Sequence, residues 1–326
     1  MIRFGVIGTN VITDTFIDAG KKLENFQVTA VYSRTPERAL SFAKKHSIVN
    51  TFTDISEMAS SKEIDAVYIA SPNSLHCSQA VEIMKSGKHV LCEKALGTTV
   101  AEVEEMIKTA RENNVLLMEA MKTTLLPNFK VIEENLPKIG KVRKFYGNYC
   151  QYSSRYDKFK NGEILNAFNP KFGGGALMDI GVYLVYADLK LFGKPEDVKC
   201  ISNILSSGID GEGSLILKHK TSTSVLSYSK VTDSDVPSEI QGELGNIIIE
   251  DISRGGSVKI VLRDGTTENL TLNQEENILT YEIDEFISLA MKGKKESKVN
   301  CHRLALKVAG VLEEARKQSG IIFGHE

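Results

Sequence analysis

Two short stretches of the chain combine residue types that can move a proton. Residues 87–94 read GKHVLCEK and place Lys94 directly after an apolar run. Residues 173–183 read GGGALMDIGVY and place Asp179 and Tyr183 four positions apart after three glycines. Side chains at i and i+4 of a helix face the same side. A lysine, a tyrosine and an aspartate that meet could transfer a proton to or from a hydroxyl group while a bound nicotinamide takes the hydride.

Both stretches also have a purely structural interpretation. Lysines are usually exposed, and Glu93 would then pair with Lys94 or point to solvent. Asp179 and Tyr183 could form a buried hydrogen bond that holds two domains together. The order of the predicted elements favours the functional interpretation, because open α/β sheets bind ligands beyond the carboxyl ends of their strands.

The first part of the chain alternates apolar runs with amphipathic helical patterns. A helix is predicted after each of the first five strands, and the strands are predicted over residues 2–8, 27–32, 50–52, 65–70, 89–92 and 115–119. This alternation predicts a parallel sheet with right-handed crossovers and helices on both faces. Lys94 then lies at the edge of the sheet that binds ligands.

At 326 residues the chain is longer than a usual single domain, so we expect two domains in an α/β fold. The first, 1–121, is a dinucleotide-binding Rossmann domain with a parallel sheet. The second, 122–326, is an α+β domain for substrate binding and dimerisation, with an open, mostly antiparallel mixed sheet. An apolar outer face of that sheet is predicted from Ile201, Ile204, Leu215, Leu217, Val225 and Leu226.

The first strand-to-helix turn is a candidate phosphate-binding loop. A dinucleotide fingerprint reads Gly-x-Gly-x-x-Gly or Ala, and here only Gly8 fits it. Asn10 stands where the second glycine lets the backbone approach pyrophosphate, and asparagine tolerates positive φ better than most residues. The position of the turn favours a cofactor role over a plain tight turn. The candidate residues are Gly8, Thr9, Asn10, Val11 and Ile12.

The end of the second strand bears on the choice of cofactor. NAD-binding domains usually have an acidic residue there, which accepts a hydrogen bond from the ribose 2′-hydroxyl. This chain has Ser33 and Arg34, followed by Arg38. A guanidinium pairs with the oxygens of a 2′-phosphate, whereas an acid repels them. We therefore expect NADP, with NAD less favoured; the alternative is a solvated arginine at a strand end.

The turns after the fourth and fifth strands complete the predicted cofactor edge. A nicotinamide ribose could lie at the first of them, unless that turn only caps the next helix. His76 is either a cofactor contact or a packing histidine. Lys94 in the second turn could stabilise a developing alkoxide. The candidate contacts are Ser71, Pro72, Asn73, His76, Glu93 and Lys94.

The composition argues against several other classes of protein. A net charge of −2 gives no electrostatic case for nucleic acid or a membrane surface. No apolar run approaches the ~18 residues of a spanning helix. The 5 cysteines and 6 histidines form no metal-ligand pattern, so we expect no metal site. Scattered, reduced cysteines and a strand at the N-terminus predict a cytoplasmic protein without a signal peptide.

The chain resembles the glucose–fructose oxidoreductase / inositol dehydrogenase (Gfo/Idh/MocA) family over nearly its whole length. Residues 87–94 and 173–183 are specific in combination, and SPNSLH at 71–76, MEA at 118–120 and IGKV at 139–142 support them. The resemblance implies a nucleotide-binding domain followed by a C-terminal α/β domain with an open mixed sheet.

The resemblance also implies roles for three residues. The lysine that matches Lys94 is catalytic in that family, and the residues that match Asp179 and Tyr183 complete the site. Tyrosine, in place of the commoner histidine, is similar to the subgroup that contains dimeric dihydrodiol dehydrogenase, which tends to use NADP. Ala95 replaces the proline of the family's Glu-Lys-Pro, and the stretch after residue 120 differs, which implies an altered substrate pocket.

We therefore expect an NADP-dependent oxidoreductase that interconverts a secondary alcohol of a sugar, polyol or dihydrodiol with its carbonyl or lactone. Tyr183 would accept the hydroxyl proton while Lys94 and Asp179 orient the substrate, although Lys94 could itself carry the proton. The expected partners are a carbohydrate-like small molecule and a second copy of the chain, in a homodimer or higher homo-oligomer. The alternative is a non-catalytic nucleotide-binding regulator, which retention of Lys94 and Tyr183 disfavours.

Overall fold

The computed structural model describes residues 1–324, which form two compact units. The first unit contains residues 1–122 and 275–306, and the second contains residues 123–274 and the chain from 307 onward. The sequence placed a single boundary between residues 121 and 122. The chain changes unit one residue later, but residues 275–306 then return to the first unit because the helix that they contain packs on its sheet.

The first unit is built on a six-stranded sheet with the order β3-β2-β1-β4-β5-β6. All of its strand pairs are parallel. This is the predicted Rossmann-type sheet, in which the strand order reverses between β1 and β4. The strands are β1 (Ile2–Ile7), β2 (Phe26–Tyr32), β3 (Asn50–Phe52), β4 (Ala66–Ile69), β5 (His89–Glu93) and β6 (Leu117–Ala120).

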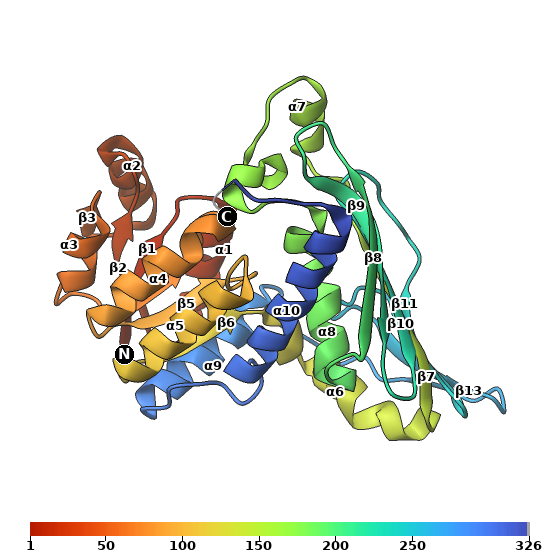
Figure 1. The fold of residues 1–326 in the computed structure, drawn as a ribbon. Coiled ribbons are helices and arrows are strands. Elements are labelled where there is room, and N and C mark those ends of the chain that lie inside the picture. The colour runs from red at the N-terminus through yellow and green to blue at the C-terminus, as the bar shows by residue number, and fades with distance from the viewer. Residues whose placement is uncertain (325–326) are drawn as a thin grey trace. The chain divides into compact units, whose positions relative to one another are not determined.

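Helices cover both faces of this sheet (Figure 1). Helices α4 and α5 pack together on one face, and α1 and α9 pack together on the other. Side chains at three N-caps, Asn10, Asp54 and Thr99, accept backbone hydrogen bonds and fix where helices begin. The helices are α1 (Val11–Gly20), α2 (Pro36–His46), α3 (Ile55–Ser60), α4 (His76–Lys85), α5 (Val100–Glu112) and α9 (Leu279–Met291).

An aromatic cluster joins α1 and α9 to the sheet. The ring of Phe16 on α1 stacks on Tyr68 of β4, with 3.8 Å between the ring centroids. Phe286 of α9 lies 5.7 Å from Phe4 of β1, again between centroids. All four side chains are completely or almost completely buried. Burial of this aromatic surface explains why a helix from the C-terminal part of the chain belongs to the first unit.

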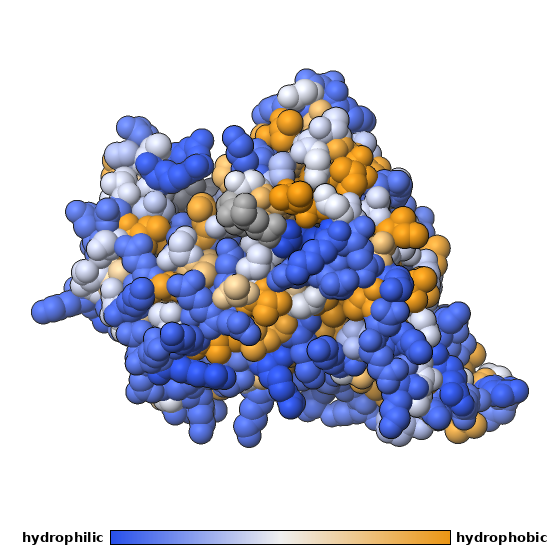
Figure 2. Space-filling view, in the orientation of Figure 1, coloured by the Kyte–Doolittle hydropathy of each residue, from blue (hydrophilic) through white to orange (hydrophobic). Residues whose placement is uncertain are grey.

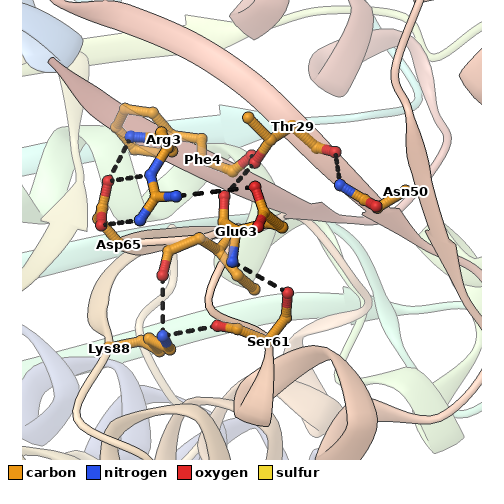
Figure 3. Close-up of polar contacts among 9 residues, drawn as sticks. Arg3, Phe4, Thr29, Asn50, Ser61, Glu63, Asp65 and Lys88 are labelled. Carbon is orange, nitrogen blue, oxygen red and sulfur yellow. Dashed lines mark hydrogen bonds and ion pairs between the residues drawn. The ribbon is translucent and has the colours of Figure 1, made fainter.

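A polar network fixes the amino end of the same sheet (Figure 3). The Arg3 guanidinium donates two hydrogen bonds to Asp65, from Nε to Oδ2 at 3.0 Å and from Nη2 to Oδ1 at 2.8 Å. Lys88 Nζ donates to the carbonyl oxygens of Ser61 and Ile64, both at 2.8 Å. The hydrogen bond from Arg3 lowers the pKa of Asp65. The network lies at the end of the strands opposite the carboxyl edge, so it stabilises the fold.

The second unit is built on an eight-stranded sheet with the order β14-β13-β12-β11-β7-β10-β9-β8. Only β7 and β10 pair in parallel, and the other pairs are antiparallel, as predicted. The strands are β7 (Val142–Cys150), β8 (Asp197–Ile204), β9 (Asp210–Lys218), β10 (Thr223–Ser229), β11 (Ser238–Gly242), β12 (Gly245–Ile249), β13 (Val258–Leu262) and β14 (Thr267–Asn269).

Helical elements of this unit pack on one face of the sheet. The π-helical turn η6 (Leu177–Gly181) continues into α8 (Val182–Phe192), and both contact β7 and β10. Residues 153–172 contain the short helix α7 (Tyr156–Lys160). The remaining helices are α6 (Pro127–Asn135) and α10 (His302–Ser319), and α10 begins in the first unit and ends in the second.

The opposite face of the eight-stranded sheet carries no helix of the described chain (Figure 1). Ile201 and Ile216 lie there with 81% and 48% of their surface exposed, and Figure 2 shows apolar atoms among polar ones over β8 and β9. The prediction that Leu215, Leu217 and Leu226 share this outer face is wrong, because all three are buried. Alternate residues of a strand point to opposite faces, so these leucines belong to the inner face.

Candidate active site

The turn between β1 and α1 packs closely against the end of β4. Gly8 has a φ of +110°, and a Cβ there would lie 2.6 Å from the carbonyl oxygen of Ala70. Asn10 has a φ of −105°, so its tolerance of positive φ is not used. Instead its amide donates to Ala70 O at 2.9 Å, and its Oδ1 accepts from Thr13 N at 3.3 Å. Asn10 thus caps α1 and ties the turn to β4.

The predicted phosphate-binding residues gather at this helix N-terminus. Thr9 and Ile12 are half-buried, and Asn10 and Val11 are exposed. The N-terminus of α1 lies at the carboxyl edge of the sheet, where backbone N–H groups and the helix dipole favour an anion. The local structure therefore fits a pyrophosphate without a full glycine fingerprint.

The segment after β2 presents two exposed arginines. Ser33 is buried, and its N–H donates to Phe52 O at 3.1 Å. Arg34 and Arg38 are exposed, and neither forms an ion pair with any residue from 1 to 324. Their charges are therefore available to a ligand, and binding of a 2′-phosphate by them stays a prediction.

His76 joins the turns that follow β4 and β5. It is fully buried, with Nδ1 2.9 Å from Ala95 O and Nε2 2.9 Å from Ser71 O. Burial lowers the pKa of His76. The peptide bond between Lys94 and Ala95 is cis. The histidine thus holds together the two turns that contain Ser71, Pro72, Asn73, Glu93 and Lys94.

Lys94 directly follows β5 and is half-buried. Its neighbour Glu93 accepts a hydrogen bond from the hydroxyl of Tyr68 at 2.5 Å. Burial raises the pKa of Glu93, and the charge of Lys94 opposes that effect. On the next strand, Glu119 accepts a hydrogen bond from Leu96 N at 2.9 Å. Buried side chains of β4 and β6 therefore fix the backbone on both sides of Lys94.

In the second unit the glycine run allows a close approach of two backbone segments. Gly175 has a φ of +110°, and a Cβ there would lie 2.2 Å from Oδ1 of Asp210. Oδ2 of Asp210 accepts a hydrogen bond from Leu177 N at 2.6 Å. Burial raises the pKa of Asp210 to about 6. Asp210, at the start of β9, therefore caps the helical segment that carries the predicted site residues.

Asp179 and Tyr183 lie where η6 passes into α8. The spacing of Asp179 and Tyr183 indicated a helix, and the structure has a π-helical turn at its start, a feature frequent at functional sites. The Asp179 carboxylate forms an ion pair with Lys230. The Tyr183 ring packs against Tyr149, with 5.7 Å between centroids. Because Tyr149 is the penultimate residue of β7 and Lys230 follows the parallel strand β10, both contacts lie at the carboxyl ends of these strands.

Three polar residues that surround Lys94 or Asp179 were not predicted from the sequence: Glu119, Asp210 and Lys230. Their signal is their place at or near a strand end. Glu119 lies inside a short apolar strand, where a buried carboxylate demands a partner. Lys230 directly follows a strand, as Lys94 does. No motif distinguishes Lys230 from other lysines, because its partner Asp179 is distant in sequence.

The described residues also bear on metals and on membranes. Within residues 1–324, no group of three or more histidine, cysteine, aspartate or glutamate side chains is arranged to hold a metal ion. The same part of the chain has no helix whose length and apolar character would let it cross a bilayer.

Family models match both parts of the chain. Residues 2–121 match the model of the oxidoreductase family with an NAD-binding Rossmann fold, GFO_IDH_MocA, and residues 135–248 match the GFO/IDH/MocA C-terminal domain. The chain is 52% identical over 323 residues to scyllo-inositol 2-dehydrogenase (NADP(+)) IolU of Bacillus subtilis, covering 99% of this chain and 98% of that protein. It is 29% identical to trans-1,2-dihydrobenzene-1,2-diol dehydrogenase of Danio rerio, covering 100% and 99%.

A solved structure shares the fold. KijD10, a 3-ketoreductase from Actinomadura kijaniata in complex with NADP and TDP-benzene, superposes with a TM-score of 0.85 at 24% identity, covering 99% of both chains. These matches confirm the expected fold class and an oxidoreductase with a nicotinamide-nucleotide-binding domain. The matches give no support to the alternative that the protein is a non-catalytic nucleotide-binding regulator. The chain belongs to the GFO/IDH/MocA oxidoreductase family.

Proposed function

We propose that this protein is an NADP-dependent dehydrogenase of ring polyols, with scyllo-inositol or a close analogue as substrate. The observation that carries the proposal is the 52% identity, over 99% of the chain, to a protein named scyllo-inositol 2-dehydrogenase (NADP(+)). In the reaction a secondary alcohol loses its C–H hydrogen as hydride to NADP⁺ and its O–H hydrogen as a proton to the protein. The products are a ketone, NADPH and H⁺.

The first unit provides groups that fit NADP. The N-terminus of α1, with residues 8–12, suits the pyrophosphate, and Ser33, Arg34 and Arg38 suit the 2′-phosphate. Residues 71–76 and Glu93 line the turns beside Lys94, where the nicotinamide ribose would bind. Bound NADP supplies the hydride acceptor.

Three side chains would handle the substrate hydroxyl. Tyr183 accepts its proton, and the Lys94 ammonium stabilises the negative charge that develops on the oxygen. Asp179, charged and paired with Lys230, accepts a hydrogen bond from the substrate and orients it. A neutral polyol suits these groups because its hydroxyls can donate to Asp179 and accept from Lys94.

The test is NADP⁺ reduction with scyllo-inositol, myo-inositol, a trans-dihydrodiol and an aldose, followed by NADPH absorbance. The wild type should turn over a cyclitol, and Lys94→Met and Tyr183→Phe should each lower kcat at least ~10²-fold. Lys85→Met, at an exposed site of α4, and Tyr146→Phe, on β7, serve as controls. Combining the two active-site changes should cost little more than either alone if both act in one step. Undiminished turnover in both single variants contradicts the assignment.

We also propose a homodimer that covers the outer face of the eight-stranded sheet, and a cytoplasmic location. The exposed Ile201 and Ile216 on an uncovered face support the dimer. The cysteines are all free, which suits a reducing compartment.

A further inference from the structure

Lys230 is a buried lysine whose position is fixed by the backbone. It directly follows β10, and its side chain is 7% exposed. Its N–H donates to Gly211 O at 2.8 Å, and its carbonyl accepts from Ser153 N at 2.9 Å. Both main-chain groups are therefore used, and the Cα is held between β9 and the segment that follows β7. A lysine is rarely this buried without a charged partner.

Two carboxylates share the charge of Lys230. Its Nζ forms a hydrogen-bonded ion pair with Oδ2 of Asp179. Its charge also acts on Asp210, the buried residue that caps η6 through Leu177 N. Lys230 thus connects Asp210, which fixes the start of η6 through Leu177 N, with Asp179, which lies on η6 two residues after Leu177. Asp179 itself is 39% exposed in its side chain, so a substrate can reach it.

We propose that Lys230 is a positioning residue for the reaction, which keeps Asp179 ionised and aimed at a substrate hydroxyl. The proposal rests on the proposed function, because it names how Asp179 recognises a polyol. An ionised carboxylate accepts hydrogen bonds and donates none, so it selects a substrate that can donate a hydroxyl to it. Lys230 acts through Asp179 and does not need to touch the substrate.

The proposal implies a pH dependence. An adjacent ammonium favours the ionised carboxylate, so without Lys230 a proton would bind Asp179 at higher pH. Other titratable groups on the elements around this pair include Asp210 and Glu212 on β9, Tyr149 and Cys150 on β7, Tyr228 on β10 and Tyr183 on α8. Burial raises the pKa of Asp210 to about 6, so Asp210 as well as Asp179 could produce the acid limb of the kcat/KM profile. The variant Asp179→Asn is therefore needed to assign that limb.

The test compares Lys230→Met with Lys230→Arg and with Lys220→Met, a control at an exposed position of the same unit. For Lys230→Met we expect KM for scyllo-inositol to rise about tenfold or more, and the acid limb of kcat/KM to move up by about 1 pH unit or more. The Kd for NADPH, from its fluorescence, should stay within about twofold. Lys230→Arg should restore most of the loss, and Asp179→Asn combined with Lys230→Met should be no worse than Asp179→Asn alone.

The outcomes separate this inference from the proposed function. An unchanged KM and acid limb in folded Lys230→Met overturns the inference while the enzyme assignment stands. If the wild type reduces no NADP⁺ with any polyol, the proposed function fails. The inference is then decided by NMR titration of ¹³C-labelled aspartate, with Asp179→Asn identifying the signal. A signal that titrates at the same pH in Lys230→Met or Lys230→Gln and in the wild type also overturns it.

Discussion

At the scale of single residues, the cofactor preference depends on the charge that follows β2. Ser33 occupies the strand end at which NAD-binding domains usually have an acid, and it is buried. Arg34, the next residue, is exposed and free of ion pairs among the described residues. A dianionic 2′-phosphate would gain a charge-assisted hydrogen bond here, whereas the 2′-hydroxyl of NAD would gain little.

Arg34→Ala should therefore change the cofactor preference. We expect kcat/KM for NADP⁺ to fall at least about tenfold and kcat/KM for NAD⁺ to change less than about threefold. Steady-state kinetics with both cofactors measures the ratio. Arg111→Ala, which removes an exposed arginine from α5, is the matched control. A preference ratio in Arg34→Ala equal to that of the wild type would mean that another group selects the cofactor.

The residue scale also shows what a sequence can and cannot predict. The position of Lys94 follows from the strand pattern alone, because a parallel sheet must place residue 94 at its carboxyl edge. The hydrogen-bond partners that fix the turns around Lys94 do not follow from the strand pattern. His76 bonds a carbonyl 19 positions away, and Glu119 bonds an N–H 23 positions away. Such partners depend on strand register, which no local pattern encodes.

At the scale of elements, α9 shows how a helix carries a buried carboxyl group into the first unit. Glu282, in its first turn, is fully buried, and neither carboxyl oxygen has a hydrogen-bond partner in the described chain. Burial, reinforced by the nearby charge of Glu93, raises the pKa of Glu282 well above its usual value. The sequence assigned the residues of α9 to the second domain, because an amphipathic pattern does not say which sheet a helix covers.

Glu282 should make the fold less stable as pH rises. The folded state keeps a proton that the unfolded state releases above its ordinary pKa of 4.5, so stability falls with pH from there to the raised value. Glu282→Gln removes this pH dependence. The free energy of unfolding of the variant, relative to that of the wild type, should therefore rise between pH 5 and 8 by at most about 1.4 kcal/mol per pH unit. Urea unfolding of both proteins at pH 5 and at pH 8 measures this difference in stability.

Glu276→Gln, at an exposed position just before α9, provides the control for this comparison. Its stability difference from the wild type should be small and should not widen with pH. A gap for Glu282→Gln that is equal at pH 5 and pH 8 would show that Glu282 titrates normally in the folded state.

The π-helical turn before α8 is a second feature that sequence patterns do not predict. Residues 175–192 have helical periodicity, and one wider turn changes that periodicity very little. Its causes are contacts from distant strands: Asp210 binds Leu177 N, and Gly181 packs against the ring of Tyr228. The glycine run does not reveal that the residue close to Gly175 is Asp210.

At the scale of the whole molecule, each unit follows from a sequence pattern, but the path of the chain between them does not. Strand–helix alternation predicted the sheet of the first unit, and closely spaced alternating runs predicted that of the second. The return of residues 275–306 to the first unit was missed. The composition of the open sheet face was only partly predicted, because the runs of β9 and β10 contain apolar residues on both faces.

Ile216→Lys should disrupt the proposed homodimer. The change places a charge among the exposed apolar side chains of the outer face, where a partner copy would have to bury it. Sedimentation equilibrium should give twice the chain mass for the wild type and the chain mass for the variant. Val49→Lys, at an exposed site of the first unit, should leave the wild-type mass unchanged. A monomeric wild type at micromolar concentration would contradict the proposal.

The most direct test of the account follows the hydrogen that leaves the substrate. The protein is mixed with NADP⁺ and scyllo-inositol deuterated at its ring carbons, and the reduced cofactor is examined by mass spectrometry and NMR. The account predicts one deuterium per NADPH, at a single face of the nicotinamide C4, and loss of this product in Tyr183→Phe. Reduced cofactor without deuterium, or undiminished product in Tyr183→Phe together with Lys94→Met, would contradict it.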